Sequence, residues 1–420
     1  MKSKYRIKDI KLAEAGRLKI EWAESHMPVL MTIREEFKRK KPFKDWKIAM
    51  CLHITKESAV LIRTIADGGA VVSIAGCNPL STQDDVAAAL ADDGYFVYGW
   101  RGIDNKSYYE NINLALDIKP DITIDDACDL VYTAHTTRKE LLKIIKGVCE
   151  ETTSGIARLR AMEKEGALKY PMIAVNDART KHLFDNRYGT GQSAIDGILR
   201  ATNVLIAGSV VVVVGYGWCG RGVAARASGL GALVVVTEVD AVSALEARMD
   251  GYRVMPIEDA SKIGDIFVSV TGNKHVIAEK HFGLMKNGAI LSNAGHFNIE
   301  IDIDALEKIS KKKRTMRPNC VEYTLANGHK LYLLAEGRLV NLSSAEGHPS
   351  EVMDMSFSTQ ALSAEFIREN YKTLAPRVYN TTPEQDQRIA LLKLSSMGVR
   401  IDKLTLQQKD YLASWKEGTK

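Results

Sequence analysis

The chain has 420 residues, which is too long for one ordinary domain and fits two or three. Hydrophobic residues make up 45% and charged residues 26%, a composition that excludes a disordered, collagen-like or disulfide-stabilised protein. The 57 basic and 52 acidic side chains leave a net charge of +5, which is too small to indicate a nucleic-acid partner.

The cysteines show no CxxC pair and no Cys/His ligand spacing; they stand at positions 51, 77, 128, 149, 219 and 320. This spacing argues against structural zinc, so no metal site is expected, and it fits reduced thiols in a cytoplasm. The N-terminal residues contain no apolar signal-peptide core, and the longest apolar run is too short to cross a bilayer. We therefore expect a cytoplasmic protein without a membrane partner.

Short β-branched runs alternate with helical patterns in the first half of the chain, which is typical of parallel sheets covered by helices. One helix is expected from Thr55, a good N-cap, to Asp67, and another opens at Ser81 in a capping-box arrangement with Asp84. The strands are expected at Lys47–His53, Ala70–Gly76, Tyr95–Trp100, Ile122–Asp126, Gly147–Glu151 and Met172–Asp177.

A helical linker over Asn176–Arg200 separates this half from a second series of strands. Lys311–Arg314 is expected to form the basic end of a helix, and the residues from about Thr382 an amphipathic helix that packs on the body or on another subunit. The pattern predicts two doubly wound, Rossmann-like α/β domains and a small C-terminal helical segment. The strands of the second domain are expected at Val210–Val214, Leu233–Glu238, Asp265–Thr271 and Ala289–Asn293.

Gly215, Gly217 and Gly220 form a G-x-G-x-x-G motif directly after the first of these strands. Glycines there permit a tight turn and let backbone N–H groups approach a pyrophosphate at a helix N-terminus. Glu238 lies 18 residues beyond Gly220, where it can accept hydrogen bonds from a ribose diol, and no cation follows it. The motif therefore predicts NAD rather than NADP; a glycine turn that serves only packing is the alternative.

Ionisable side chains gather at the carboxyl ends of the strands expected in the first domain, where ligands bind in open α/β sheets. They are His53, Asp126, Glu151 and Asp177. Together they indicate acid–base chemistry. Taken singly, His53 can be a core histidine, and Asp126 and Glu151 can be helix N-caps.

Lys181 and Asp185 are four residues apart on the linker helix, so they share one face. The spacing alone favours a surface ion pair; the alternative is a lysine that takes a proton from a sugar hydroxyl, if burial lowers its pKa. His296 ends a strand beside the expected nicotinamide site, which favours a role in proton transfer. His348 lies in a turn that is expected to be a second crossing between the domains.

Seven separated segments closely resemble the S-adenosyl-L-homocysteine hydrolase family: CLHITKESAVLI, CNPLSTQDDVAAAL, EETTSG, VNDARTKHLFDNRYGTGQS, GYGWCGRG, NAGHFNIEID and LLAEGRLVNLSSAEGHPSEVM. The resemblance implies reversible hydrolysis of S-adenosyl-L-homocysteine to adenosine and L-homocysteine, with one tightly bound NAD per subunit of a homotetramer. In the family's mechanism the 3′-hydroxyl is oxidised, homocysteine is eliminated, water adds to C5′ and the ketone is reduced again.

The resemblance also implies roles for individual residues. Lys181 and Asp185 handle the 3′-hydroxyl proton, Glu151 holds the 2′-hydroxyl, and Asn186 lies between substrate and nicotinamide. Three residues share proton abstraction at C4′, thiol departure and water addition at C5′, and which residue performs which step stays open. They are His53, Asp126 and His296. The implied NAD contacts are Thr152, Thr153, Ser154, Asn186, Gly215, Gly217, Trp218, Cys219, Gly220, Arg221, Gly222, Glu238, Ser243, Ala294, Gly295, His296 and Asn341.

Thr55 and Glu57 match positions that recognise the adenosine, and His348 matches a position whose backbone reads the base. Glu57 favours adenine, because its carboxylate accepts from an amino group and would meet a hypoxanthine carbonyl with no proton to share. The chain departs from the family at Glu346 and Glu351, which replace a methionine and an aromatic residue. It also ends without the long tail of many members and is similar to short archaeal ones. Some of these prefer S-inosyl-L-homocysteine, which stays an alternative substrate.

Two departures affect the cofactor region: Thr190 replaces a frequent cysteine, and Ser243 replaces an asparagine near the NAD ribose, which weakens cofactor retention. The implied domains are a substrate-binding domain at 1–180 and 350–385, an NAD-binding domain at 190–346 and a C-terminal dimerisation segment at 386–420. Two other functions share the fold class. A hydroxy-acid dehydrogenase would need an arginine at a strand end of the first domain, where none is found, and a silent NAD-binding sensor would lack the acid–base set, which is complete.

Overall fold

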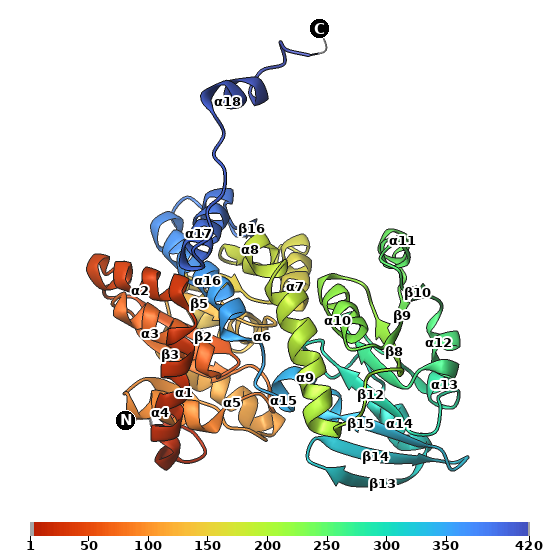
Figure 1. The fold of residues 1–420 in the computed structure, drawn as a ribbon. Coiled ribbons are helices and arrows are strands. Elements are labelled where there is room, and N and C mark those ends of the chain that lie inside the picture. The colour runs from red at the N-terminus through yellow and green to blue at the C-terminus, as the bar shows by residue number, and fades with distance from the viewer. Residues whose placement is uncertain (1–3, 419–420) are drawn as a thin grey trace.

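Two sheets of eight strands each organise residues 4–418, which are the part of the chain that the structure, a computed structural model, describes. They form two lobes that lie side by side (Figure 1). The first sheet has the order β1-β4-β3-β2-β5-β6-β7-β16, and all of its strands are parallel. Its strands are β1 (Tyr5–Arg6), β2 (Lys47–Leu52), β3 (Val71–Gly76), β4 (Phe96–Tyr98), β5 (Ile122–Asp125), β6 (Gly147–Glu150), β7 (Met172–Ala174) and β16 (Val378–Asn380).

Helices cover both faces of this sheet, because alternate residues of a strand enter two separate apolar cores. In β2, Ile48 and Met50 belong to one core, whereas Ala49 and Cys51 belong to the other. Double burial explains why these strands are continuous apolar runs without polar alternation. The α-helices of this lobe are α1 (Ala13–Ser25), α2 (Pro28–Lys40), α3 (Lys56–Asp67), α4 (Asp84–Asp92), α5 (Asn105–Leu116), α6 (Asp129–Thr136), α7 (Thr153–Lys164), α16 (Ser350–Asn370) and α17 (Pro383–Ser396).

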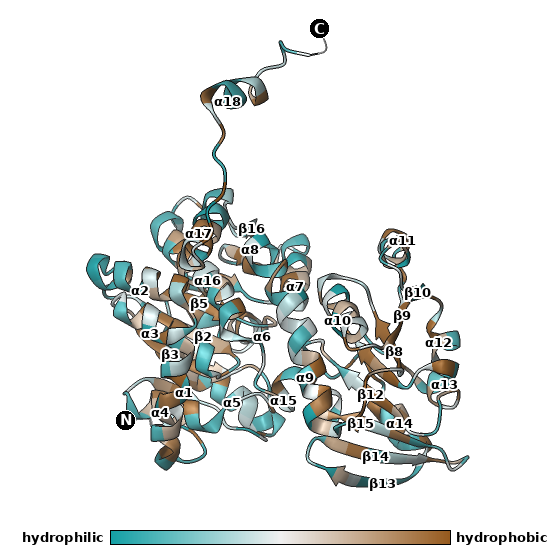
Figure 2. Cartoon of the chain, in the orientation of Figure 1, coloured by the Kyte–Doolittle hydropathy of each residue, from teal (hydrophilic) through white to brown (hydrophobic). Residues whose placement is uncertain are grey.

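The second sheet has the order β10-β9-β8-β11-β12-β15-β14-β13, and its strands are parallel except that β14 runs antiparallel to β15 and β13. Its interior strands are also covered on both faces, and β8 and β9 are drawn mostly in brown in Figure 2. The prediction of two doubly wound α/β sheets is confirmed. The strands are β8 (Val210–Val214), β9 (Leu233–Thr237), β10 (Arg253–Val254), β11 (Ile266–Ser269), β12 (Ala289–Asn293), β13 (Ser310–Arg317), β14 (Cys320–Leu325) and β15 (Lys330–Leu334). The helices are α10 (Trp218–Gly229), α11 (Ala241–Met249), α12 (Ile257–Ile263), α13 (Glu279–Phe282), α14 (Ile303–Ile309) and α15 (Val340–Ser343).

The chain passes from the first sheet to the second after β7, and it returns after α15. On returning, α16 packs against α2, α3 and β6, so its residues complete the first lobe. The predicted linker helix is present but broken into several segments. They are a 3-10 turn η3 (Val175–Asp177), α8 (Arg179–His182), a π-helical turn η4 (Asp185–Gly189) and α9 (Thr190–Thr202).

The prediction for Lys311–Arg314 is wrong, because these residues lie inside the edge strand β13. Lys312, Lys313 and Arg314 pair antiparallel with β14, and Nε of Arg314 pairs with Oε1 of Glu322 at 2.7 Å. Exposed charged side chains suit an edge strand, since they oppose pairing with a further strand.

Ser81 does not begin a helix. α4 begins at Asp84 with Gln83 at its N-cap. The hydroxyl of Ser81 instead contacts Nδ1 of His53 at 2.6 Å, so a residue expected to cap a helix supports a predicted site residue. Several strands also end earlier than expected, so that His53 and Asp126 lie just beyond β2 and β5.

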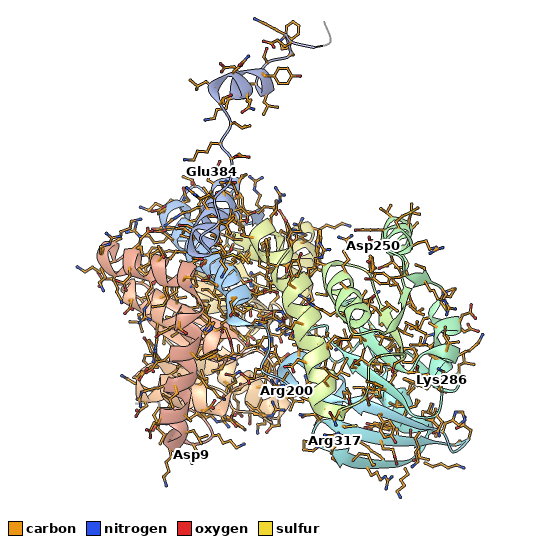
Figure 3. All side chains as sticks on the ribbon, viewed as in Figure 1. Asp9, Arg200, Asp250, Lys286, Arg317 and Glu384 are labelled. Carbon is orange, nitrogen blue, oxygen red and sulfur yellow. The ribbon has the colours of Figure 1, made fainter. Side chains whose placement is uncertain are left out.

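The C-terminal segment divides into two parts. α17 begins after the N-cap Thr382, buries Ile389 and packs against α2 and α16, so it is part of the first lobe. α18 (Leu406–Leu412) stands clear of both lobes and buries none of its residues (Figure 1). Charged side chains cover the outside of the body, as at Lys286 and Glu384 (Figure 3). Within residues 4–418, no helix combines the length and the apolar character that a membrane crossing requires.

Candidate active site

A cavity of about 1100 Å³ lies between the two lobes and is lined by residues of both. The carboxyl ends of strands from both sheets meet there, as expected for ligand sites of open α/β sheets. Asp177 lies outside it and pairs with Arg160 (Oδ2–Nη2, 2.7 Å). The predicted site residues that line it are His53, Thr55, Glu57, Asp126, Glu151, Thr152, Thr153, Ser154, Lys181, Asp185, Asn186, Gly215, Gly217, Trp218, Cys219, Glu238, Ala294, Gly295, His296, Asn341 and His348.

Lys181 is buried, which excludes the surface ion pair that its spacing favoured. Its Nζ donates to Oδ1 of Asp185 and of Asn186 at 3.1 Å each, and to Oδ1 of Asn176 at 3.2 Å. Burial alone would lower the pKa of Lys181, but the carboxylates of Asp185 and Glu151 outweigh it and hold that pKa above its ordinary value. The lowered lysine pKa on which the sequence hypothesis depended is therefore not found, and Nζ is an ammonium with three acceptors.

Asp185, in the π-helical turn η4, connects two chain segments: the one that leaves the first lobe after β7, and the one that returns to it after α15. Its Oδ2 accepts from the hydroxyl of Ser356 at 2.8 Å, and Nε2 of His348 lies 3.4 Å from Oδ1. Burial would raise the pKa of Asp185, yet Lys181 and His348 lower it below the ordinary range. Nδ1 of His348 lies 3.0 Å from the hydroxyl of Ser193 on α9. These contacts hold Asp185 as a carboxylate at the junction of the lobes.

Asp126 lies between two histidines, one from each lobe. Its Oδ2 is 3.4 Å from Nε2 of His53, and its Oδ1 is 3.5 Å from Nδ1 of His296. The centroids of the two imidazole rings are 5.6 Å apart. Burial lowers the pKa of His53 to about 4, against the opposing effect of Asp126. His53 is therefore neutral at neutral pH and can accept a proton, as a general base must.

Glu151 keeps one carboxylate oxygen available for a ligand. Its Oε2 accepts from Nε2 of Gln360, whereas its Oε1 is buried and makes no hydrogen bond with the described residues. Nζ of Lys181 lies 3.4 Å from this second oxygen. Burial raises the pKa of Glu151 to about 7, although Lys181 acts in the opposite direction. The free oxygen is suited to accept from a ligand hydroxyl beside the ammonium.

A second row of carboxyl groups, which the sequence analysis missed, lies directly behind these residues. Asp125 and Glu150 end the neighbouring strands β5 and β6, pair in register and are fully buried. Oε1 of Glu150 accepts from the backbone N–H of Ala127 at 2.8 Å and of Thr152 at 3.1 Å. Oδ1 of Asp125 accepts from the N–H of Asp126 at 3.0 Å. These bonds fix the backbone on which the cavity-lining carboxylates stand.

The pKa values of the second row are raised. Burial raises the pKa of Asp125 to about 8, and burial together with Asp125 raises that of Glu150 well above its ordinary value. Oε2 of Glu150 makes no hydrogen bond with the described residues, so it can carry the proton. A Cβ on Gly155 would lie 2.1 Å from Oε1 of Glu150, so only glycine leaves room for this carboxyl group. The sequence signal was the doublet of acids at each strand end.

Thr55 and Glu57 line one end of the cavity, and the ammonium of Lys56 lies beside Glu57 behind this lining. Oε1 of Glu57 accepts from the hydroxyl of Ser350 at 2.7 Å and lies 3.2 Å from Nζ of Lys56. The same ammonium pairs with Oε2 of Glu346 at 3.0 Å. Glu346, one of the departures from the family, therefore holds Lys56 beside Glu57 from across the return passage.

The glycine turn fits a dinucleotide. Gly215 has φ of +106°, a conformation that favours glycine, and a Cβ on Gly220 would lie 2.1 Å from the carbonyl oxygen of Gly215. Gly217, by contrast, faces open space at the N-terminus of α10. Oε2 of Glu238 accepts from the N–H of Tyr216 at 2.6 Å, which places the carboxylate beside the turn. A close approach to backbone N–H groups and an acid for a ribose diol are what NAD requires.

Four predicted NAD contacts do not line the cavity: Gly220, Arg221, Gly222 and Ser243. A Cβ on Gly222 would lie 1.7 Å from the carbonyl oxygen of Arg187, so this glycine lets α10 pack against η4. The guanidinium of Arg221 lies 4.4 Å from the ring centroid of Trp218. Ser243 stands in the first turn of α11, away from the cavity. These residues shape the elements around the turn.

Several residues that complete the network were not predicted as site residues. They come from elements distant in sequence, and they are Asn176, Ser193, Ser350, Ser356 and Gln360. The last three belong to α16, whose return to the first lobe a local pattern does not reveal. Asn176 could have been found, because it lies two residues beyond β7.

Comparison with known proteins identifies the family. The profile described as "S-adenosyl-L-homocysteine hydrolase, NAD binding domain" matches residues 186–347, and that described as "S-adenosyl-L-homocysteine hydrolase" matches residues 4–143. The S-inosyl-L-homocysteine hydrolase of Methanocaldococcus jannaschii is 63% identical over 99% of this chain and 100% of its own length. The adenosylhomocysteinase of Aquifex aeolicus is 58% identical over 98% of this chain and 99% of its own. The adenosylhomocysteinase of Saccharolobus solfataricus is 58% identical over 99% of this chain and 100% of its own length. The chain belongs to the S-adenosyl-L-homocysteine hydrolase family.

Proposed function

We propose that this protein catalyses the reversible hydrolysis of S-adenosyl-L-homocysteine to adenosine and L-homocysteine with tightly bound NAD. One observation carries the proposal: two separate acid–base groups, Lys181 with Asp185 and His53 with Asp126 and His296, line the same cavity as the glycine turn. A sensor that only bound the dinucleotide would need neither group. A simple dehydrogenase would need only one of them.

NAD, when bound, supplies the reversible oxidation of a secondary hydroxyl group. The protein holds the ribose with Glu151, whose free Oε1 accepts from one hydroxyl. The ammonium of Lys181, which Asp185 and Asn186 keep in place, lies beside the neighbouring hydroxyl and stabilises negative charge on its oxygen. Because the ammonium and the free carboxylate oxygen are 3.4 Å apart, they can bind adjacent hydroxyl groups of a vicinal diol.

The histidine pair around Asp126 serves the second part of the reaction. Loss of a proton beside a ketone, departure of a thiol and addition of water each need a group that changes its protonation state. Neutral His53 accepts a proton. The carboxylate of Asp126 lies between the imidazole rings of His53 and His296. Since His296 comes from the other lobe, this set is complete only when the lobes are together.

A second candidate substrate, S-inosyl-L-homocysteine, is favoured by two relatives. S-inosyl-L-homocysteine hydrolases of Methanocaldococcus jannaschii and Methanococcus maripaludis are 63% and 60% identical to this chain. Glu346 also holds the ammonium of Lys56 beside Glu57, which places a cation next to the residue expected to read the base. Adenine remains our first choice, because Glu57 lines the cavity and its carboxylate accepts from the amino group.

A competition assay tests both statements. Purified protein is given equal amounts of the adenosyl and inosyl thioethers without added NAD, and release of each nucleoside and of homocysteine is followed. We expect both substrates to be turned over with the protein-bound NAD alone, and adenosine to be released faster than inosine. Homocysteine release that required added NAD would contradict the mechanism, and faster inosine release would reverse the choice of base.

The assembly and its place in the cell are part of the same proposal. We infer a homotetramer in the cytoplasm, with the domains divided at 1–180 with 350–385, 190–346 and 386–420 and hinges near Asp177–Gly191 and Gly347–Pro349. The first part of the 386–420 segment, up to the end of α17, also packs on the first lobe. The two passages between the sheets support these hinges. Light scattering coupled to size exclusion measures the subunit number, and a stable monomer or dimer would contradict it.

A further inference from the structure

Cys77 lies beside the histidine–carboxylate pair, and no step of the proposed reaction uses it. Its Sγ is 3.7 Å from Oδ2 of Asp126, and Nε2 of His53 is 3.4 Å from the same oxygen. One ligand atom from each of these residues lies within 4.8 Å of the others. The three residues directly follow β2, β3 and β5, which are neighbours in the sheet, so linear Cys/His spacing could not reveal the cluster.

The hydrogen bonds of Ser81 leave an electron pair of His53 without a donor. The Ser81 hydroxyl donates to the carbonyl oxygen of Asn78 at 3.3 Å, so its oxygen accepts from Nδ1–H of His53 at 2.6 Å. In the tautomer with the proton on Nδ1, the ring's lone pair is on Nε2, which lies 3.4 Å from a carboxylate oxygen of Asp126. Two facing acceptors attract a positive species between them.

Two of the three separations in the cluster suit a tetrahedral metal ion, and the third, between His53 and Cys77, is no more than 4.8 Å. Zinc bonds of about 2.0–2.3 Å to nitrogen, oxygen and sulfur place tetrahedral ligands about 3.3–3.8 Å apart. The separations of 3.4 Å and 3.7 Å from Oδ2 of Asp126 fall within that range. The bond from Nδ1–H of His53 to Ser81 is also the outer contact that orients a metal-binding histidine.

We propose that His53, Cys77 and Asp126 form a site for a thiophilic divalent cation such as Zn²⁺. Binding forms one bond each from Nε2, Sγ and a carboxylate oxygen, and the thiol proton of Cys77 leaves to solvent. The fourth position faces the cavity, which His53 and Asp126 line. The bound cation occupies the lone pair of His53 and the carboxylate of Asp126, which the reaction needs, so it inhibits the enzyme. The binding stands on this geometry alone, whereas the inhibition rests on the proposed function.

Cobalt spectroscopy tests the binding separately from activity. Protein with its bound NAD is titrated with Co²⁺ in thiol-free buffer, and we expect one ion per chain with intense visible d–d bands and a near-ultraviolet thiolate-to-cobalt band. Cys77→Ser is expected to remove the thiolate band and to weaken binding by more than about tenfold. Cys320→Ser, which removes a distant thiol on β14, is the matched control and keeps the wild-type spectrum.

Inhibition is measured with Zn²⁺ and varied substrate. We expect competition with substrate in the wild type, and an inhibition constant raised by more than about tenfold in Cys77→Ser. Absence of the thiolate band in the wild-type protein, or a band retained in Cys77→Ser, would overturn the site even if a variant folded poorly. Cobalt binding without zinc inhibition would leave the site and refute the proposed use of His53 and Asp126 in catalysis.

Discussion

Burial and neighbouring charge set opposite protonation states for two buried basic residues. His53 faces one carboxylate, and desolvation prevails, so its pKa falls to about 4. Lys181 is more deeply buried, but two carboxylates prevail over desolvation and keep it charged. One residue is thereby prepared to receive a proton and the other to hold one, which is the division that a two-part acid–base reaction requires.

Replacement of Lys181 by methionine tests the first half of the reaction. Lys181→Met keeps most of the buried volume but removes the ammonium, so we expect kcat to fall by about 10²- to 10⁴-fold. Homocysteine release and the NAD content of the purified protein are measured together. Lys286→Met, at an exposed position, is the control and stays at wild-type activity. Full activity in Lys181→Met would remove this residue from the reaction.

The base preference is tested at Glu57. In Glu57→Gln the side-chain amide can donate to the hypoxanthine carbonyl, which a carboxylate cannot do. We expect the ratio of kcat/KM for the inosyl over the adenosyl substrate to rise by about tenfold. Glu351→Gln makes the same chemical change outside the cavity and serves as the control. An unchanged ratio in Glu57→Gln would show that another group reads the base.

At the level of elements, the ends of β5 and β6 each contribute one carboxyl group to the cavity and one behind it. The rear pair holds backbone N–H groups of the following loops, in which Ala127 and Cys128 both have positive φ values (+85° and +68°). Non-glycine residues rarely adopt this conformation. Glu150 therefore stabilises a loop whose backbone conformation is unfavourable. This loop directs Asp126, the residue before Ala127, toward His53 and His296.

Glu150 offers a prediction that separates support from charge. Glu150→Gln keeps an acceptor for the N–H groups of Ala127 and Thr152 and mimics the protonated carboxyl, so kcat is expected to stay within about threefold of the wild type. Glu150→Ala leaves both donors without a partner, and kcat is expected to fall by more than about tenfold. Steady-state kinetics with circular dichroism compare the two. Equal losses would show that the charge itself matters.

The strands and the glycine turn could be predicted because they depend on local patterns. β8 and β12 have the expected bounds, and Gly215 adopts the positive φ that the motif requires. Lys311–Arg314 could not be assigned this way, since its strand forms only through pairing with β14. The partners of Glu57 and Glu151 on α16 were missed for a similar reason, because long-range packing brings them into place. The raised pKa of Lys181 depends on Glu151, which follows β6, as well as on Asp185, so the spacing of Lys181 and Asp185 could not reveal it.

For the whole molecule, the buried carboxyl groups make stability depend on pH. Glu150 and Asp125 have raised pKa values in the folded state, so they bind protons at pH values at which the unfolded chain has lost them. The contribution of Asp125 is complete below its unfolded value of 3.8 and is lost as pH rises through about 8. Glu151 adds the same trend up to about 7. These groups lower the free energy of unfolding as pH rises across this range.

Urea denaturation at two pH values tests this dependence. Glu150→Gln cannot lose a proton, so its free energy of unfolding should fall less than that of the wild type between about pH 5.5 and about pH 8. Glu351→Gln, at a position outside the buried cluster, should follow the wild type. A wild type and a Glu150→Gln variant with parallel pH profiles would show that Glu150 is already ionised in the folded protein.

The placement of α16 and β16 has a consequence for biosynthesis. The second lobe is contiguous in sequence, whereas the first sheet waits for β16, which pairs with β7 although residues 175–377 lie between them. During translation the later lobe can therefore finish folding while the earlier one still exposes the apolar surface that α16 will cover. Ser356 and Gln360 also emerge late. A ribosome-bound chain that already holds its dinucleotide would thus stay inactive until its final helices have left the exit tunnel.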